Sequence, residues 1–121
     1  REGVPAQSAE GVALKDLKGS PLLSRYSAVE LDDQRRIVSF EEKPPKPKTS
    51  LISIGVYLYP KKEIKRIRQY LDEGLTPDAP GYYVQWLVKQ TDVYGFIMEG
   101  PWYDIGDIDS YNAANALYER K

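Results

Sequence analysis

The segment Leu51–Tyr59 constrains the fold more than any other, because β-branched and aromatic side chains follow one another there with little interruption. Such a composition is typical of a strand buried on both faces of a sheet. Pro60 follows directly and suits the first position of a helix, which Gly74 would end. The apolar residues of that helix recur at helical spacing as Ile64, Ile67 and Leu71. A strand that leads straight into an amphipathic helix predicts an α/β domain.

The remaining segments complete a mixed sheet with flanking helices. A hairpin is predicted because two alternating runs, Arg25–Leu31 and Arg36–Glu42, flank the turn residues Asp32, Asp33 and Gln34. Apolar patterning and turn signals predict further elements: strands at Val12–Leu14 and Val93–Met98, a proline-punctuated loop at Thr76–Gly81, a helix at Tyr82–Gln90, an extended piece at Trp102–Ile105, and a last helix capped by Asp107 or Asp109. We expect residues 1–11 to form a tail or linker and residues 12–121 to form one domain.

The composition narrows the chemistry. The 121 residues include no cysteine and no histidine, which excludes disulfides, thiol nucleophiles and histidine general bases. The net charge is −1, so no basic field favours nucleic acid. No apolar run is long enough for a membrane span, and we expect a cytoplasmic protein. High charge with a single Met favours a thermophilic source. The chain opens at Arg1 rather than Met, which indicates part of a longer polypeptide.

The residues that could carry chemistry lie at predicted strand ends and in the late loop. Phe40-Glu41-Glu42-Lys43-Pro44 places a carboxylate beside an ammonium where a strand should end. Ser53-Ile54-Gly55-Val56-Tyr57 lies in the central strand, and Asp104 follows much later. A carboxylate, an ammonium, a glycine and a tyrosine could gather around a small, hydroxylated and phosphorylated ligand.

With these residues the chain resembles the C-terminal half of the sugar-1-phosphate nucleotidyltransferases, which include glucose-1-phosphate thymidylyl- and uridylyltransferases. The resemblance runs from about Val12 to Tyr118. Its motifs follow in family order: Arg25-Tyr26, Glu41-Glu42-Lys43-Pro44, Ser53-Ile54-Gly55, Tyr57, Pro80-Gly81-Tyr82, Val93-Tyr94-Gly95 and Trp102-Tyr103-Asp104-Ile105-Gly106. The resemblance implies the C-terminal part of a Rossmann-like fold.

The resemblance also implies residue roles. Glu42 would accept hydrogen bonds from sugar hydroxyls, and the ammonium of Lys43, the implied catalytic group, would face the sugar phosphate. The other substrate-binding residues would be Tyr26, Ser27, Ser53, Gly55 and Tyr57. Asp104 would be one of the carboxylates that hold Mg²⁺, the implied cofactor. The family usually has glycine where this chain has Ser27, and threonine or serine where it has Ile54, which leaves the sugar open.

The full enzyme would join dTTP or UTP to a sugar 1-phosphate, with glucose 1-phosphate the expected sugar, and release pyrophosphate. The glycine-rich loop that clamps the triphosphate belongs to the family's N-terminal half, and nothing in Arg1–Gly11 resembles it. We therefore expect this chain to carry the sugar-phosphate side of the site and to be inactive alone. We also expect a homo-oligomer.

Other interpretations stay open for these residues. Glu41-Glu42-Lys43 could be the polar end of a hairpin, Pro44–Lys48 a polyproline ligand rather than a loop, and Tyr57 a core residue. The Tyr82-Tyr83-Trp86 cluster suits helix–sheet packing better than stacking on a base. Asp104, Asp107 and Asp109 lack the glycine and glutamate of a calcium loop, so capping by Asp107 is favoured. A non-catalytic assembly or regulatory module of the same fold is the alternative function.

Overall fold

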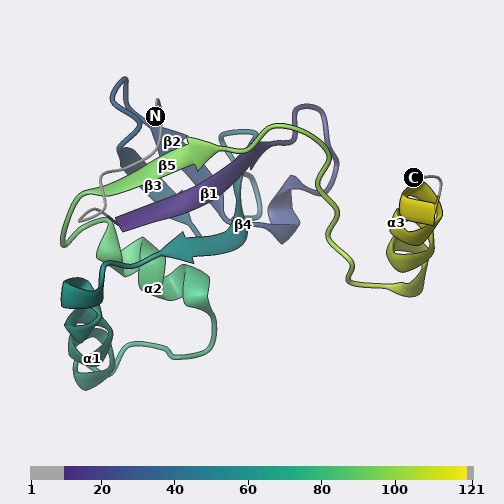
Figure 1. Ribbon diagram of the computed structural model, residues 1–121. Helices are drawn as coiled ribbons and strands as arrows, with labels where there is room; N and C mark the ends of the chain where they lie inside the picture. The colour runs from purple at the N-terminus through teal and green to yellow at the C-terminus, as the bar shows by residue number, and fades with distance from the viewer. Residues whose placement is uncertain (1–9, 120–121) are drawn as a thin grey trace.

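A computed structural model describes residues 10–119, which form a curled sheet, two helices packed against it and a C-terminal arm (Figure 1). The elements follow the chain in this order: β1 (Glu10–Asp16), β2 (Ala28–Leu31), β3 (Ile37–Glu41), β4 (Leu51–Leu58), α1 (Lys65–Asp72), α2 (Pro80–Leu87), β5 (Val93–Ile97) and α3 (Ile108–Glu119). Short 3₁₀ turns lie at Leu23–Arg25 and Lys61–Glu63.

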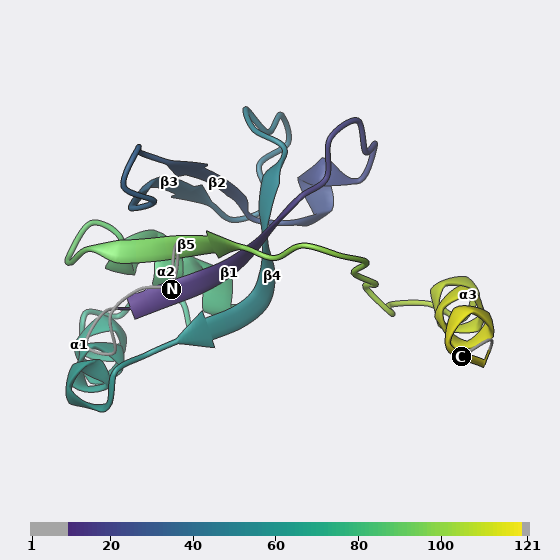
Figure 2. The same ribbon diagram turned by 45° about the horizontal axis from the view of Figure 1, so that its top comes forward.

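The sheet is mixed, as predicted. Its strand order is β3-β2-β4-β1-β5, with β1 and β5 parallel and the other pairs antiparallel. The predicted hairpin is the β2–β3 pair. The two edges of the sheet approach each other where Gly95 N of β5 donates at 2.8 Å to the carbonyl oxygen of Arg35, in the turn before β3, and where Arg36 bridges Tyr94. The sheet is therefore curled (Figure 2).

The core lies between the sheet and the helices. Leu14, Val29, Val84 and Leu87 are fully buried in it. Burial of such side chains is the main stabilising term in a domain of this size. Tyr83 adds aromatic contacts at ring-centroid distances of 5.3–5.8 Å, and its partners are Tyr59, Tyr70 and Trp86. The packing role predicted for Tyr83 and Trp86 is confirmed, whereas Tyr82 remains 38% exposed.

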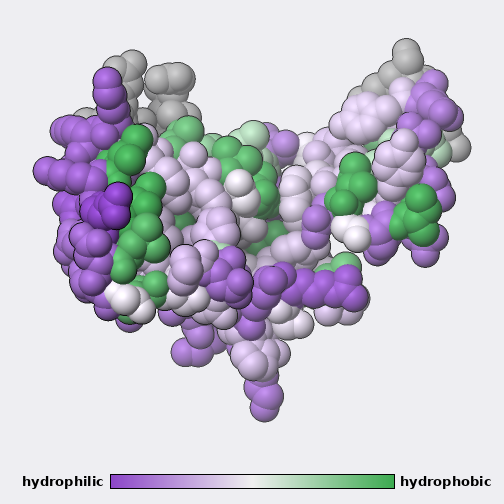
Figure 3. Space-filling model, turned by 90° about the horizontal axis from the view of Figure 1, so that it is seen from below, coloured by the Kyte–Doolittle hydropathy of each residue, from purple (hydrophilic) through white to green (hydrophobic). Residues whose placement is uncertain are grey.

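The apolar stripe predicted for the helix after Pro60 is wrong as a core face. Ile64 and Leu71 are 49% and 44% exposed, whereas Tyr70 is buried. Ile67 is the one member of the predicted stripe that packs against the core, and Tyr70 packs beside it. The orientation in which α1 packs on the rest of the domain therefore decides which of its apolar residues are buried. Apolar side chains gather on the surface at the α1 end of the molecule (Figure 3).

Strand β4 is also less buried than predicted. Ile52 and Ser53 are buried, but Gly55, Val56 and Leu58 are exposed. A β-bulge explains the change, because the β1–β4 pairing skips from Leu14↔Ser53 to Val12↔Tyr57. Gly55 has a φ of +84° there, a conformation that favours glycine. Pairing with β1 resumes at Tyr57 and Leu58, so the bulge bends β4 while both of its halves stay in the sheet.

Several predicted boundaries need correction. Strand β1 begins at Glu10, so Glu10 and Gly11 belong to the sheet rather than to the predicted tail, and residues 1–9 lie outside the described range. Helix α2 begins at Pro80, inside the predicted loop, because proline suits the first helical position. The expected extended piece at Trp102–Ile105 pairs with no strand among the described residues.

The C-terminal arm comprises residues 98–119 and places α3 away from the sheet (Figures 1 and 2). Its start is held by the Lys15 ammonium, which donates to the carbonyl oxygens of Met98 (3.4 Å) and Gly100. Predicted capping by Asp107 is confirmed, since its Oδ1 accepts the Ser110 N–H at 2.7 Å.

Candidate functional site

The ends of β2, β3 and β4 and the start of the arm enclose an open hollow of about 310 Å³. This volume lies at the lower end of the range found for small-molecule sites. All eight residues singled out from the sequence line it: Tyr26, Ser27, Glu42, Lys43, Ser53, Gly55, Tyr57 and Asp104. The fold therefore brings the β3 end, the β4 bulge and the arm to one place.

Glu42 is the best-held side chain of the hollow. The Ser27 hydroxyl donates to Glu42 Oε1 at 2.8 Å, and the Glu42 backbone N–H donates to Gln85 Oε1 at 3.0 Å. Hydrogen bonds to a charged acceptor are stronger than neutral ones. Ser27, just before β2, thus holds the carboxylate, and Gln85 of α2 holds the Glu42 backbone, while the side chain remains at the wall of the hollow.

Lys43 follows Glu42 in an unusual backbone conformation. Its φ is 45°, in the left-handed region that residues with a Cβ seldom adopt. Such strained residues cluster at functional sites because the surrounding structure holds them there. The turn at Lys43 ends the strand pairing of β3 and leaves the lysine exposed at the hollow.

The bulged part of β4 forms a second wall. Ser53 is 7% exposed, and its hydroxyl has no hydrogen-bond partner within residues 10–119. Buried hydroxyls nearly always have a partner, so a group in the hollow that Ser53 lines is a candidate partner for this one. Nothing lies within 4 Å of the place where a Gly55 Cβ would be, so the backbone is open there. Tyr57 lines the hollow and also stacks on Tyr59 at a ring-centroid distance of 6.1 Å, so it contributes both to the wall of the hollow and to aromatic packing.

Asp104 reaches the hollow from the arm. The Tyr26 hydroxyl donates to Asp104 Oδ2 at 3.1 Å, and Tyr26 meets Trp102 edge-on at 5.5 Å. Burial first, and then this bond to a carboxylate, raise the pKa of Tyr26 above its usual value. Within residues 10–119 no three metal-ligating side chains gather as a metal cluster would need. Asp104 fits a cation site as one exposed carboxylate ligand.

Sequence reasoning missed several residues of the site. Arg25, Trp102 and the Ala79–Gly81 turn also line the hollow, and Gln85 anchors Glu42 from behind. Pro80-Gly81 and Trp102 stood within motifs of the resemblance, which was a signal for their place. Gln85 gave none, because a polar residue in a helix is most often solvent-exposed.

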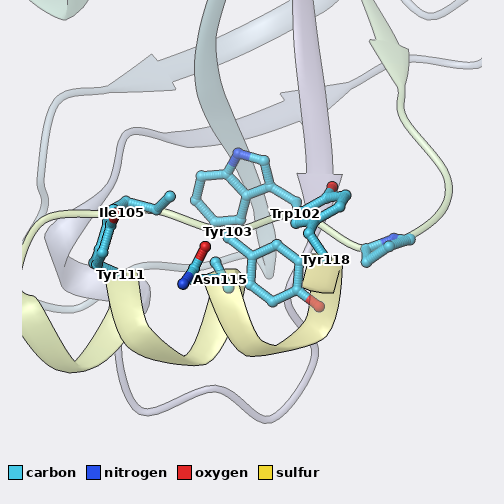
Figure 4. Close-up of a pocket in the computed structure, with 8 residues that line it drawn as sticks. Trp102, Tyr103, Ile105, Tyr111, Asn115 and Tyr118 are labelled. Atoms are coloured by element: carbon cyan, nitrogen blue, oxygen red, sulfur yellow. The ribbon is translucent and has the colours of Figure 1, made fainter. Parts of the chain in front are cut away.

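A second hollow, of about 420 Å³, lies within the arm, between α3 and the segment 101–105 that precedes it (Figure 4). Ile105 and Tyr111 lie at one end of it, and Trp102, Tyr103 and Tyr118 at the other (Figure 4). Its lining contains no charged side chain. It lacks the groups that would neutralise a phosphate, so the smaller hollow around Glu42 is the better candidate site.

Comparison with known proteins identifies the family of this chain. Residues 5–121 match the sequence profile of the nucleotidyl transferase family. The chain therefore belongs to the nucleotidyl transferase family. The resemblance to sugar-1-phosphate nucleotidyltransferases and the predicted α/β fold are both confirmed.

Curated relatives and solved structures carry names that differ in the nucleotide. A glucose-1-phosphate adenylyltransferase of Thermotoga neapolitana is 35% identical over 96 residues, and one of Thermosipho melanesiensis is 33% identical over 94. Each alignment covers 76% of this chain and 23% of the relative. The chain thus spans about a quarter of the length of these curated relatives.

Solved structures show the same fold. A Bacillus anthracis protein described as a glucose-1-phosphate thymidylyltransferase, solved with sucrose, has a TM-score of 0.66 at 30% identity, over 91% of this chain and 43% of its own. A UDP-glucose pyrophosphorylase solved with UDP-glucose has a TM-score of 0.72 at 21% identity, over 93% and 45%. Among the described helices none is long and apolar enough to cross a membrane.

Proposed function

We propose that this chain supplies the sugar-phosphate-binding side of a sugar-1-phosphate nucleotidyltransferase. One observation carries the proposal: a carboxylate, an ammonium and an unpartnered buried hydroxyl, on separate parts of the chain, line one hollow. The carboxylate and hydroxyl suit a polyol, and the ammonium suits a phosphate. A sugar 1-phosphate carries both a polyol and a phosphate, so this combination of groups suits it.

Each side chain has a proposed part in binding. Glu42 and the Ser53 hydroxyl take hydrogen bonds from the sugar hydroxyls, while the bare backbone at Gly55 lets the ring approach closely. Tyr26 and Ser27 complete the sugar wall. In this proposal Tyr57 and Lys43 contact the phosphate, and Lys43 is the catalytic residue.

The proposed reaction needs no protein nucleophile. A phosphate oxygen of the sugar 1-phosphate attacks the α-phosphorus of the nucleoside triphosphate, and the bond to pyrophosphate breaks as the new P–O bond forms. Catalysis of this kind depends on in-line positioning and on neutralising charge. Lys43 performs both for the attacking phosphate, since its ammonium offsets negative charge and fixes the oxygen that attacks.

Mg²⁺ is the proposed cofactor, with Asp104 as one ligand. Hard oxygen donors suit this ion, which usually takes one or two carboxylates together with substrate phosphates. When bound, Mg²⁺ supplies further neutralisation of the phosphates. Asp104 itself is held ready for this by the Tyr26 hydroxyl.

The sugar and the nucleotide belong to the finer part of the proposal. We propose glucose 1-phosphate with dTTP or UTP, and the names of the two curated relatives add ATP as a third candidate. Pyrophosphate release by the full-length enzyme with glucose 1-phosphate, compared for dTTP, UTP and ATP, decides among them.

The test is a calorimetric titration of the 121-residue chain with glucose 1-phosphate, with glucose and inorganic phosphate as matched half-ligands. We expect saturable binding of glucose 1-phosphate, tighter than that of either half-ligand. Pyrophosphate release from dTTP, UTP or ATP by the chain alone should be absent. Absence of glucose 1-phosphate binding would overturn the proposal and favour a non-catalytic module, and pyrophosphate release would show that the chain is more than one side of the site.

A further inference from the structure

Three neighbours converge on Glu42, and only Ser27 among them was singled out from the sequence as a substrate-binding residue. Ser27 on the β2 side donates its hydroxyl proton to Oε1 at 2.8 Å. Gln85 of α2 accepts the Glu42 backbone N–H at 3.0 Å. Gly81, in the first turn of α2, lies against the carboxylate itself. The side chain of Glu42 is therefore bounded by the residue before β2 and by the first turn of α2, which is distant from β3 in sequence.

Gly81 is needed for its size. A Cβ placed on Gly81 would lie 1.9 Å from Glu42 Oε2 and 2.5 Å from its Cδ. Contacts that short do not occur in folded proteins, so any larger residue at position 81 would displace the carboxylate. Gly81 lies in a regular helical turn, so the requirement is one of space rather than of backbone conformation.

The Ser27 hydroxyl has one proton, which it donates in the hydrogen bond to Glu42 Oε1. Its lone pairs therefore remain as acceptors at the wall of the hollow. A ligand group beside Ser27 and Glu42 must then be a donor, as the hydroxyls of a sugar are. Because of the same hydrogen bond, Oε1 is the Glu42 oxygen that already has a partner.

We propose that Gly81 and Ser27 are positioning residues, which hold the Glu42 carboxylate in the orientation that receives the sugar hydroxyls. Gly81 leaves the space for the carboxylate, and Ser27 fixes its rotation by binding one oxygen. This inference rests on the proposed function of the hollow. It adds that sugar affinity depends on a residue that makes no polar contact of its own.

Substitution of Gly95 distinguishes a positioning role of Gly81 from a merely structural one. A Cβ at Gly95 would meet Leu14 Cδ1 at 2.6 Å and Leu31 Cδ2 at 2.8 Å. Both glycines thus avoid a clash, but the clash at Gly95 involves Leu14 and Leu31, neither of which lines the hollow. Gly95→Ala is therefore the matched control for Gly81→Ala.

The experiment titrates glucose 1-phosphate into the 121-residue chain and its variants, with the folded fraction measured by circular dichroism. Gly81→Ala should raise the Kd about tenfold or more, as expected when a charged hydrogen-bond acceptor is displaced. Gly95→Ala should lower the melting temperature but leave the Kd of the folded protein unchanged. An unchanged Kd in Gly81→Ala would overturn the inference.

Rescue provides a sharper criterion. Glu42→Asp shortens the side chain and should weaken binding in the wild-type background, but it gives room for the added methyl group. In the Gly81→Ala background the same change should tighten binding again, so the two substitutions couple strongly. Losses that simply add would contradict the inference.

Two further measurements keep the inference testable if Gly81→Ala folds poorly or the wild type binds no sugar phosphate. Ser27→Ala should raise the Kd several-fold, whereas Ser50→Ala, which removes a similar bond to Asp16 at 2.6 Å, should not. A crystal structure of Ser27→Ala or Gly81→Ala should show Glu42 rotated from its wild-type position. An unmoved carboxylate would overturn the positioning role whether or not the wild type binds glucose 1-phosphate.

Discussion

Glu10 and Glu42 are two carboxylates at the ends of different strands of the sheet, and their surroundings are opposite. Glu10 begins β1, is 2% exposed, and neither of its oxygens has a hydrogen-bond partner within the described chain. Glu42 follows β3, binds Ser27 through its side chain, and borders an open hollow. The first carboxylate is enclosed without partners, and the second is held by partners and left accessible.

The difference shows how one residue type acquires different roles. Burial, aided by the charge of Glu63 and opposed by that of Arg66, raises the pKa of Glu10 to about 7. A charged carboxylate in such surroundings destabilises the folded state. Glu42 avoids that cost because it keeps hydrogen-bond partners and contact with solvent. We expect substitutions near Glu42 to change binding and substitutions at Glu10 to change stability.

The largest effect is expected at Lys43, beside Glu42. Lys43→Ala should weaken glucose 1-phosphate binding by about a hundredfold, because a charge-assisted contact to the phosphate is lost. Its melting temperature should hardly change, since Lys43 is exposed. Calorimetric titration measures the first quantity and thermal unfolding the second. Lys46→Ala, in the same loop but outside the lining, is the control, and equal affinities for the two variants would remove Lys43 from the site.

A smaller effect, on stability alone, is expected at Glu10. Its pKa is higher in the folded chain than in the unfolded chain, so the folded state binds more protons between pH 4.5 and about 7. Stability should therefore fall as pH rises through this window. Glu10→Gln should remove that dependence and raise the free energy of unfolding at pH 8 by about 2 kcal/mol.

Urea unfolding at pH 5 and pH 8 measures the Glu10 effect. The exposed Glu41→Gln variant is the matched control and should keep the wild-type pH profile. A Glu10→Gln variant with the wild-type profile would contradict the comparison, because Glu10 would then carry no destabilising charge.

The smallest effect concerns two left-handed residues at opposite ends of β3. Arg35 has a φ of 66° and Lys43 a φ of 45°, so glycine should relieve strain at each by up to about 1 kcal/mol. Both Arg35→Gly and Lys43→Gly should unfold at higher urea concentration than the wild type. Only Lys43→Gly should lose affinity for glucose 1-phosphate. Loss of affinity in Arg35→Gly would show that the turn, rather than the ammonium, controls binding.

The sequence predicted the membership of the site better than its geometry. Glu42, Lys43 and Asp104 stood in ordered motifs, and family folds place such motifs together, so their convergence was foreseeable. Their roles in binding and catalysis stay predictions. The contacts of Gly81 and Gln85 with Glu42 were not foreseeable, because they depend on where α2 packs against β3.

The fold, too, could be predicted only in part from the sequence. The hairpin, the mixed sheet and the cap at Asp107 followed from local turn and capping chemistry. The β4 bulge and the outward face of α1 did not, since strand register and helix phase are set by tertiary packing. The enclosure of Glu10 was equally hidden, because isolated charge in a sequence gives no measure of burial.

Tyr26 has a consequence for how the two sides of the hollow communicate. Its hydroxyl donates to Asp104 Oδ2 and its ring packs edge-on against Trp102, so Tyr26 also ties the hollow to the strip of chain that leads to α3. Under the roles proposed for Tyr26 and Asp104, a sugar that re-orients this ring also disturbs the hydrogen bond to the proposed cation ligand. The proposal thus couples sugar binding to the placement of the cation through one tyrosine.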